Sequence, residues 1–310
     1  MIKVSILHYE DAMRSAIYGI MDLFTIANRL SQSDKFEVQH ELDFDDTVIN
    51  KLPDIVIVPP SGAHPLPDFK CLNMTSYLTY LANHNVDIAA SCAGVFWLAE
   101  AGLLNGKNVT THWNLCERLN REYPQINHVE KRDILVVDRG ITTAAGLFAY
   151  QDLVLHLIAQ YEGFELAKRV ADFALLDING RLQAYYERFV PDTSHGDAMV
   201  LKAQRYCTEN PKSSVKDIAE HCKISERSLH RKFVSVLEIS PREYIVQAKI
   251  EHARTLLCSS EMTVEKVAYE LGYQDVSNFG RTFKKVTQLS PAAFRRRQIN
   301  HQDTLHSSIK

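Results

Sequence analysis

The stretch GYQDVSNFGRTFKKVTQLSPAAF, residues 272–294, decides the fold of the C-terminal part of the chain. Three apolar side chains recur in it at spacings of four and three residues, so they share one helix face: Phe279, Phe283 and Val286. Asp275 can accept backbone N–H bonds at the start of this helix, and Ser290 followed by Pro291 begins the next one. The stretch therefore predicts a turn, an amphipathic helix, a second turn and a further helix.

The outer surface of this helix is basic and carries an amide. The polar residues that lie largely off the apolar face are Asn278, Arg281, Lys284 and Lys285. A helix with a buried aromatic stripe and such an outer surface suits the major groove of DNA.

The same pattern occurs fifty residues earlier in the chain. The matching positions are Leu229, Arg231, Phe233, Val236, Ser240, Pro241 and Tyr244 in the first copy, and Phe279, Arg281, Phe283, Val286, Ser290, Pro291 and Phe294 in the second. A short helix signal precedes each copy, over 215–222 and 264–271, and residues 241–257 would form the helix between them. The direct interpretation is two helix-turn-helix units in tandem. The alternative is a helical bundle with a solvated basic face.

Residues 198–298 resemble the tandem helix-turn-helix domain of AraC/XylS-type transcription regulators, and 272–294 resembles the signature of that family. The resemblance implies binding to double-stranded promoter DNA through recognition helices over 226–236 and 276–286. Matching the family motif residue by residue implies these base-reading positions: Arg227, His230, Arg231, Ser277, Asn278 and Arg281. Arg231 and Arg281, being equivalent in the repeat, could instead clamp phosphates. Phosphate contacts are expected from Lys232, Lys284 and Lys285.

Charge is divided unevenly along the chain, although the formal net charge of the 310 residues is only −3. Residues 199–310 hold 19 Lys and Arg against 12 Asp and Glu, a net charge of +7. Residues 1–198 hold 16 against 26, a net charge of −10. A basic C-terminal module joined to an acidic N-terminal one is expected when only one of them meets DNA.

The cysteines and the N-terminus indicate a cytoplasmic protein. None of the six cysteines forms a CxxC pair or lies at zinc spacing with a histidine, so reduced thiols in a cytosol fit best. Residues 1–15 contain only a short apolar run, which predicts no signal peptide, and no apolar run approaches the length of a membrane span. We therefore expect no metal, no cofactor and no membrane contact.

Strand and helix signals alternate over the first 190 residues. Strands are expected over 4–7, 36–42, 54–58, 86–90, 109–111 and 134–137. Helices are expected over 13–30, 72–82, 92–101, 150–161 and 165–176. This order predicts an α/β domain with a flavodoxin-like parallel sheet and helices on both faces, followed by the all-α C-terminal domain.

Cys92 occupies a position where such a fold places function. It lies between a predicted buried strand and a helix, which is the context of a nucleophile elbow at the carboxyl edge of the sheet. The N–H groups of the helix N-terminus are expected to lower the pKa of a thiol there. The alternative is that Cys92 is a small buried residue at a tight turn.

Residues 2–188 resemble the PfpI-like domains of the class I glutamine amidotransferase superfamily. The resemblance is sharpest over SCAGVFWLAEAGLLNGKNVTTHW (91–113) and TTAAGLFAYQDLVLHLI (142–158). The chain as a whole resembles GlxA-type regulators, which fuse such a domain to an AraC-type module. That resemblance implies a homodimer and a small nitrogenous effector such as an amino acid or a quaternary amine.

The resemblance also raises the alternative of a cysteine-dependent hydrolase or glyoxalase-like enzyme with an accessory DNA-binding domain. Such hydrolases need a thiolate, a base beside it and an orienting group. In PfpI-type proteases a histidine follows the nucleophile and an acid contacts the thiol, whereas Ala93 and Ala16 stand at those positions here. We therefore expect no catalytic residue and interpret the region of Cys92 as a retired active site used as a sensor pocket.

The candidates for contact with the effector are Cys92, Gly62, His112 and Tyr9. Gly62, His112 and Tyr9 each follow a predicted strand, and Gly62 matches the family's glycine whose backbone N–H can face a ligand anion. The loop that contains Tyr9 could equally be an ordinary exposed loop. A carboxylate is expected to dock at the helix N-terminus after Cys92, where free N–H groups and a partial positive charge meet it.

The sequence thus predicts an AraC-type transcription regulator. Its expected segments are a sensor domain (1–190), a linker (191–197), a DNA-binding domain (198–298) and a polar tail (299–310). The expected partners are promoter DNA, a small effector, a second copy of the chain, and RNA polymerase if the protein is an activator. The effector, the promoter and the choice between activation and repression stay open.

Overall fold

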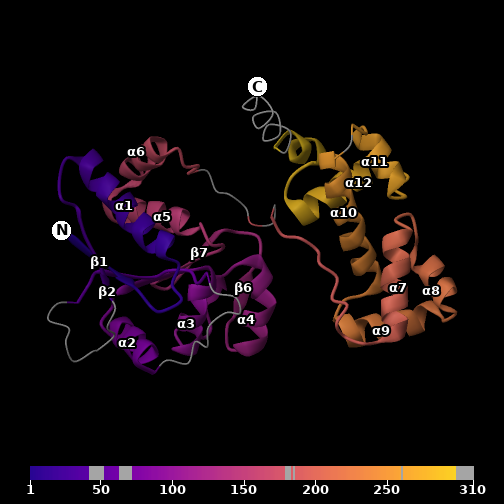
Figure 1. Ribbon diagram of the computed structural model, residues 1–310, viewed down its shortest axis with the longest axis horizontal. Coiled ribbons are helices and arrows are strands. Elements are labelled where there is room, and N and C mark those ends of the chain that lie inside the picture. The colour runs from indigo at the N-terminus through magenta and orange to yellow at the C-terminus, as the bar shows by residue number, and fades with distance from the viewer. Residues whose placement is uncertain (42–51, 63–71, 179–182, 184–185, 260, 298–310) are drawn as a thin grey trace. The chain divides into compact units, whose positions relative to one another are not determined.

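The computed structural model describes residues 1–41, 52–62, 72–178, 183, 186–259 and 261–297. The chain divides into two compact units, Met1–Ala184 and Tyr185–Lys310 (Figure 1). The predicted polar tail lies outside the described residues. Within the described residues, no helix combines the length and the hydrophobicity that a membrane span requires.

A six-stranded sheet forms the centre of the first unit. Its strands are β1 (Ile2–Leu7), β2 (Phe36–Glu41), β3 (Ile55–Val58), β4 (Asp87–Ser91), β7 (Leu135–Asp138) and β8 (Ile141–Ala144). They lie in the order β2-β1-β3-β4-β8-β7. All neighbours are parallel except β7 and β8, which are antiparallel. The predicted α/β class with a mostly parallel sheet is confirmed.

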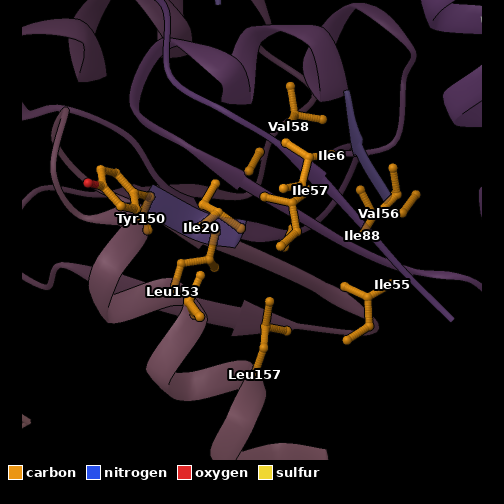
Figure 2. Packing of buried hydrophobic residues seen from close by; sticks show 14 of the residues in the cluster. Ile6, Ile20, Ile55, Val56, Ile57, Val58, Ile88, Tyr150, Leu153 and Leu157 are labelled. Atoms are coloured by element: carbon orange, nitrogen blue, oxygen red, sulfur yellow. The ribbon is translucent and has the colours of Figure 1, made fainter. Parts of the chain in front are cut away.

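Helices cover both faces of this sheet (Figure 1). On one face lie α1 (Arg14–Ser31), α5 (Tyr150–Glu162) and α6 (Phe164–Ala174). On the other lie α2 (Leu72–Asn83), α3 (Val95–Glu100) and α4 (Cys116–Glu122). Figure 2 shows Ile20 of α1 and Leu153 of α5 near Ile57 of β3, and all three side chains are fully buried. Every residue of β3 is buried, as expected for a parallel strand covered on both faces.

Several features of this unit differ from the sequence prediction, which gave neither α4 nor β6 (His128–Glu130). Strand β8 was not predicted, because Ile141–Ala144 is a four-residue segment with two threonines, yet it lies between β4 and β7 with all four residues buried. The predicted strand near Val109 does not join the main sheet. It forms β5 (Asn108–Thr110), which pairs in parallel with β6 in a separate small sheet.

The second unit is helical, as predicted. Its helices are α7 (Ala198–Glu209), α8 (Val215–Cys222), α9 (Glu226–Leu237), α10 (Pro241–Ser259), α11 (Val264–Glu270) and α12 (Val276–Thr287), and residues 291–297 are also helical. Tyr244 and Ile245 of α10 belong to the core around Phe233, while Ile250 and Leu257 belong to a second core. The long helix α10 therefore joins two helix-turn-helix units by contributing to both cores.

Caps set the limits of the recognition helices α9 and α12. Asp275 accepts hydrogen bonds from the backbone N–H groups of Ser277 (2.8 Å) and Asn278 (3.1 Å), which confirms the predicted cap. Ser225 caps α9 in the same way, by accepting from the Ser228 N–H. Ser290 accepts from the Ala293 N–H at 3.2 Å, so the predicted start of the final helix is also confirmed.

The division between the units falls between Ala184 and Tyr185, a little before the expected boundary at Val190. The reason is that residues 186–189 pack on α10. Arg188 forms an ion pair with Glu251 at 3.1 Å, and the backbone N–H of Phe189 donates to the same carboxylate at 3.3 Å. These residues therefore belong structurally to the helical unit.

Candidate ligand site and DNA-binding surface

Cys92 lies at a sharp elbow where β4 ends. It begins a short 3-10 helix, Cys92–Gly94, and its own φ is +52°, in the left-handed region that residues other than glycine rarely adopt. Gly94 packs against the end of the neighbouring strand β3. A Cβ at this position would stand 2.4 Å from the carbonyl oxygen of Pro59, which follows β3. The elbow is thus held in a conformation of high local energy by close backbone packing.

Several strand ends meet at this elbow. The backbone N–H groups of Ala93 and of Gly146, which follows β8, act on the Cys92 thiol and favour its ionised form. The hydroxyl of Thr111, directly after β5, donates to the Cys92 carbonyl oxygen at 2.7 Å. The carboxyl ends of β4, β5 and β8 therefore converge at Cys92. In α/β folds, ligands bind at the carboxyl ends of the strands.

The Cys92 thiol is buried and protonated. Only 4% of the residue is exposed, and this burial raises the pKa of the thiol to about 11, against the smaller lowering effect of its two N–H partners. The expectation of a lowered pKa was therefore wrong. The sequence context showed the N–H groups of the following helix but not the depth of burial, and the loss of solvation outweighs those groups.

The buried thiol predicts slow alkylation. With a pKa of about 11, only about one Cys92 thiol in a thousand is ionised at pH 8. We expect iodoacetamide at pH 8 to label the partly exposed Cys222 and Cys258 well before Cys92, and the Cys92 rate to rise steeply towards pH 11. Peptide mass spectrometry over a pH series measures this. Labelling of Cys92 first at pH 7 would contradict the assignment of a neutral thiol.

Tyr9 brings the end of β1 to the same place. Its hydroxyl donates to the Pro59 carbonyl oxygen at 2.9 Å, and its ring meets Trp97 edge-on with centroids 5.6 Å apart. Burial raises the pKa of Tyr9 well above its usual value, and the nearby Cys92 raises it further by a smaller amount. Tyr9 is therefore a buried residue that packs beside the elbow and is not an exposed loop residue, and its contact with an effector stays a prediction.

Gly62 follows β3 and His112 follows β5, and each has an internal partner. The Gly62 N–H donates to the Asp11 carbonyl oxygen at 3.4 Å. His112 accepts from the Asn114 N–H at 3.2 Å through Nδ1, and burial lowers the pKa of its imidazole. In the described part of the chain no hydrogen bond joins His112 to Cys92. Their proposed roles in ligand binding stay predictions.

The sequence interpretation passed over three residues that build the elbow: Trp97, Thr111 and Gly146. Thr111 and Gly146 lie inside the two stretches that carry the resemblance, so a signal was present in both. Thr111 donates to the backbone carbonyl of Cys92, and Gly146 acts through its own backbone N–H. Backbone groups have no residue-specific pattern in sequence. Among the described residues, no group of three or more His, Cys, Asp or Glu side chains could hold a metal ion.

The two recognition helices present the predicted DNA-reading residues to solvent. All six are exposed: Arg227, His230, Arg231, Ser277, Asn278 and Arg281. The opposite face of each helix is anchored in its core, by Leu229 and Phe233 in α9 and by Phe279 and Phe283 in α12. These four core residues are fully buried, so the outer face of each helix is held in a fixed orientation.

The basic residues on these faces differ in their partners. Lys232 of α9 forms a 2.7 Å ion pair with Asp197, the residue that also caps α7. Arg281 of α12 lies 3.9 Å from Asp275, and both of these side chains are well exposed. Lys284 and Lys285 are exposed in the last turn of α12, and within the described residues neither has an ion-pair partner.

This difference predicts unequal roles in phosphate binding. Replacing Lys284 or Lys285 by glutamine should weaken binding to all DNA sequences. It should also reduce the magnitude of the slope of log K against log salt concentration by about one. Lys232→Gln should change that slope less, because Lys232 is already paired with Asp197. Anisotropy titrations over a KCl series measure the slopes. Equal slope changes at Lys232 and Lys284 would contradict this ranking.

Comparison with known proteins agrees with both units. Residues 27–160 match the DJ-1/PfpI family, and residues 218–297 match a helix-turn-helix domain family. The chain is a helix-turn-helix transcription regulator with a DJ-1/PfpI domain. The second match covers the recognition helices α9 and α12, and the first covers the Cys92 elbow.

Known relatives share this architecture. The HTH-type transcriptional regulator CdhR of Pseudomonas aeruginosa is 29% identical over 71% of this chain and 66% of its own length. The HTH-type transcriptional regulator GlxA of Rhizobium meliloti is 29% identical over 71% of this chain and 68% of its own length. A crystal structure of a protein from Vibrio parahaemolyticus shares the fold of part of the chain, with a TM-score of 0.50 at 15% identity over 56% of this chain and 98% of that one.

Proposed function

We propose that this regulator binds paired promoter elements through α9 and α12 and that a small metabolite in the DJ-1/PfpI unit controls the binding. The observation that carries the DNA-binding part is the pair of exposed basic helix faces on two cores that share α10. One helix per core suits two successive major grooves on one side of the duplex, which lie about 10 base pairs apart.

The elbow at Cys92 supports a sensor and not a catalyst. A cysteine nucleophile needs a thiolate, whereas burial holds the pKa of Cys92 near 11. The chain has Ala93 and Ala16 where PfpI-type proteases carry a histidine and an acid. The proposed effector, a small nitrogenous compound such as an amino acid or a quaternary amine, would bind where the strand ends meet around Cys92.

The proposal also includes assembly and location. A homodimer formed mainly by the first unit would place two copies on neighbouring sites, since symmetric pairing is the default for such proteins. The protein would act on the chromosome in the cytoplasm and would contact RNA polymerase if it activates transcription. Light scattering of the full chain at micromolar concentration tests the dimer, and a monomer there would remove it from the proposal.

A DNA-binding measurement tests the reading helices. A preferred sequence is first selected from random duplexes with the full chain, and affinities are then measured by anisotropy. Arg281→Ala should cost about 1–3 kcal/mol and relax the preference at one base pair if Arg281 reads a base. A uniform loss over all sequences would assign Arg281 to phosphate, and unchanged affinity would remove it from the interface.

A separate measurement tests the effector. Thermal shift of the full chain against a panel of amino acids and quaternary amines should reveal a stabilising compound. That compound should change the affinity for the selected duplex, and Cys92→Ser should retain basal DNA binding. Consumption of the compound by the wild-type protein but not by Cys92→Ser would replace the sensor proposal with the enzyme alternative.

A further inference from the structure

Residues 186–189, here called the strap, bind along α10 at the point where the two helix-turn-helix units meet. Arg188 and the Phe189 N–H both bind the Glu251 carboxylate. The Glu187 carbonyl oxygen accepts a hydrogen bond from Arg254, a residue of α10 that is only 2% exposed. The strap is therefore fixed to the connecting helix through its backbone and through a charged side chain.

The strap contacts the first helix-turn-helix unit through an aromatic chain. Phe189 meets Tyr244 edge-on, with ring centroids 5.2 Å apart. Tyr244 in turn meets Phe233 of the recognition helix α9 edge-on at 5.4 Å. Tyr244 and Phe233 are each 1% exposed, so the orientation of α9 depends on this packing.

The strap reaches the second unit through Arg254. The guanidinium lies 5.8 Å from the centroid of the Phe294 ring. Phe294 meets Phe283 at 5.4 Å, and Phe283 lies 5.7 Å from Phe279, so the contact continues to the recognition helix α12. At the edge of the same unit, Arg297 donates to the Tyr186 hydroxyl at 3.1 Å and also lies over its ring.

The energetics make Arg254 sensitive to the position of the strap. A buried guanidinium is stable only when hydrogen-bond acceptors and an opposite charge replace its water shell. The strap supplies a carbonyl acceptor at Glu187, and it holds the Glu251 carboxylate that lies 3.9 Å from the Arg254 guanidinium. Movement of the strap would therefore disturb the packing of both cores at once.

We propose that Arg254 is a positioning residue and that the docked strap fixes the separation and angle of α9 and α12. The strap thereby sets which spacing of the two DNA half-elements the protein selects. This inference rests on the proposed paired reading of DNA by the two helices. Because the strap continues the chain from the first unit, it is also the segment through which a change in that unit can alter DNA selection.

The test compares half-element spacing in wild type and variants. Duplexes carry the selected two half-elements at the preferred spacing, at spacings longer by one and two base pairs, or a single half-element alone. We expect wild type to discriminate against the longer spacings by roughly tenfold or more per inserted base pair, and Arg254→Met to reduce this to about twofold. Affinity for the single half-element should be equal in the two proteins.

Further variants keep the outcome decisive. Arg254→Lys should recover part of the discrimination, and Arg205→Met, which changes an exposed arginine of α7, should retain all of it. Arg188→Gln loosens the strap from outside the core and replaces Arg254→Met if that variant does not fold. Spacing discrimination retained by Arg254→Met or Arg188→Gln overturns the inference, whereas wild type that binds no half-element pair overturns the proposed paired reading itself.

Discussion

Replacing Gly94 by alanine is expected to lower the free energy of unfolding of the first unit by about 3 kcal/mol. The added Cβ would lie 2.4 Å from the Pro59 carbonyl oxygen and 2.9 Å from that of Val58, and both atoms belong to rigid backbone. The elbow must open to admit it, which breaks the close packing of Gly94 against the end of β3. Urea unfolding followed by tryptophan fluorescence reports this unit alone, because both tryptophans, Trp97 and Trp113, lie in it.

Gly62→Ala is the matched control for this change. Gly62 also follows β3, but a Cβ there would meet nothing within 4 Å. We expect its unfolding midpoint to equal that of wild type. A Gly94→Ala protein as stable as wild type would show that the elbow is not close-packed, and the assignment of a rigid site around Cys92 would then be wrong.

Replacing Phe283 by alanine is expected to cost about 3–5 kcal/mol and to abolish specific DNA binding. Phe283 is fully buried in α12, between Phe279 at 5.7 Å and Phe294 at 5.4 Å. The loss is a large share of the stability that a small domain possesses, about 5–15 kcal/mol, so the outer face of α12 would lose its fixed orientation. Thermal unfolding by circular dichroism and anisotropy with the selected duplex measure the two effects.

Tyr269→Ala is the control for the second unit. Tyr269 lies in the neighbouring helix α11 with 54% of its surface exposed, so removing its ring leaves no cavity. We expect nearly wild-type stability and DNA affinity. Retention of sequence-selective DNA binding by Phe283→Ala would mean that α12 is not a recognition helix whose orientation the core determines.

The sequence predicted the helical unit better than the sheet, for a physical reason. A helix shows its buried face through residues three and four apart, and its limits through caps such as Asp275, so both signals are local. Strand β8 is a short segment whose place between β4 and β7 depends on pairing with distant residues. Such pairing has no local pattern, and for that reason β8 was missed.

The candidate site could be predicted only in part. The strand-to-helix context located the elbow at Cys92, because that pattern is local. The raised pKa of Cys92 depends on burial by other strands, and the pairing of Lys232 with Asp197 depends on the packing of α9 beside α7. Both require the positions of residues far apart in the chain. The local pattern around Cys92 therefore predicted the wrong direction for its pKa, and no local pattern indicated the pairing of Lys232.

The docked strap also determines where this protein can be cut and recombined. A fragment that starts at Ala198, the limit suggested by the resemblance to AraC/XylS-type domains, would leave out Glu187 and Phe189 and with them the contacts to Arg254 and Tyr244. A DNA-binding module transplanted from this chain to another sensor should begin at Tyr186, so that the foreign domain is joined ahead of the strap. Fusions made after the strap would carry both reading helices but not the part that holds them at one distance.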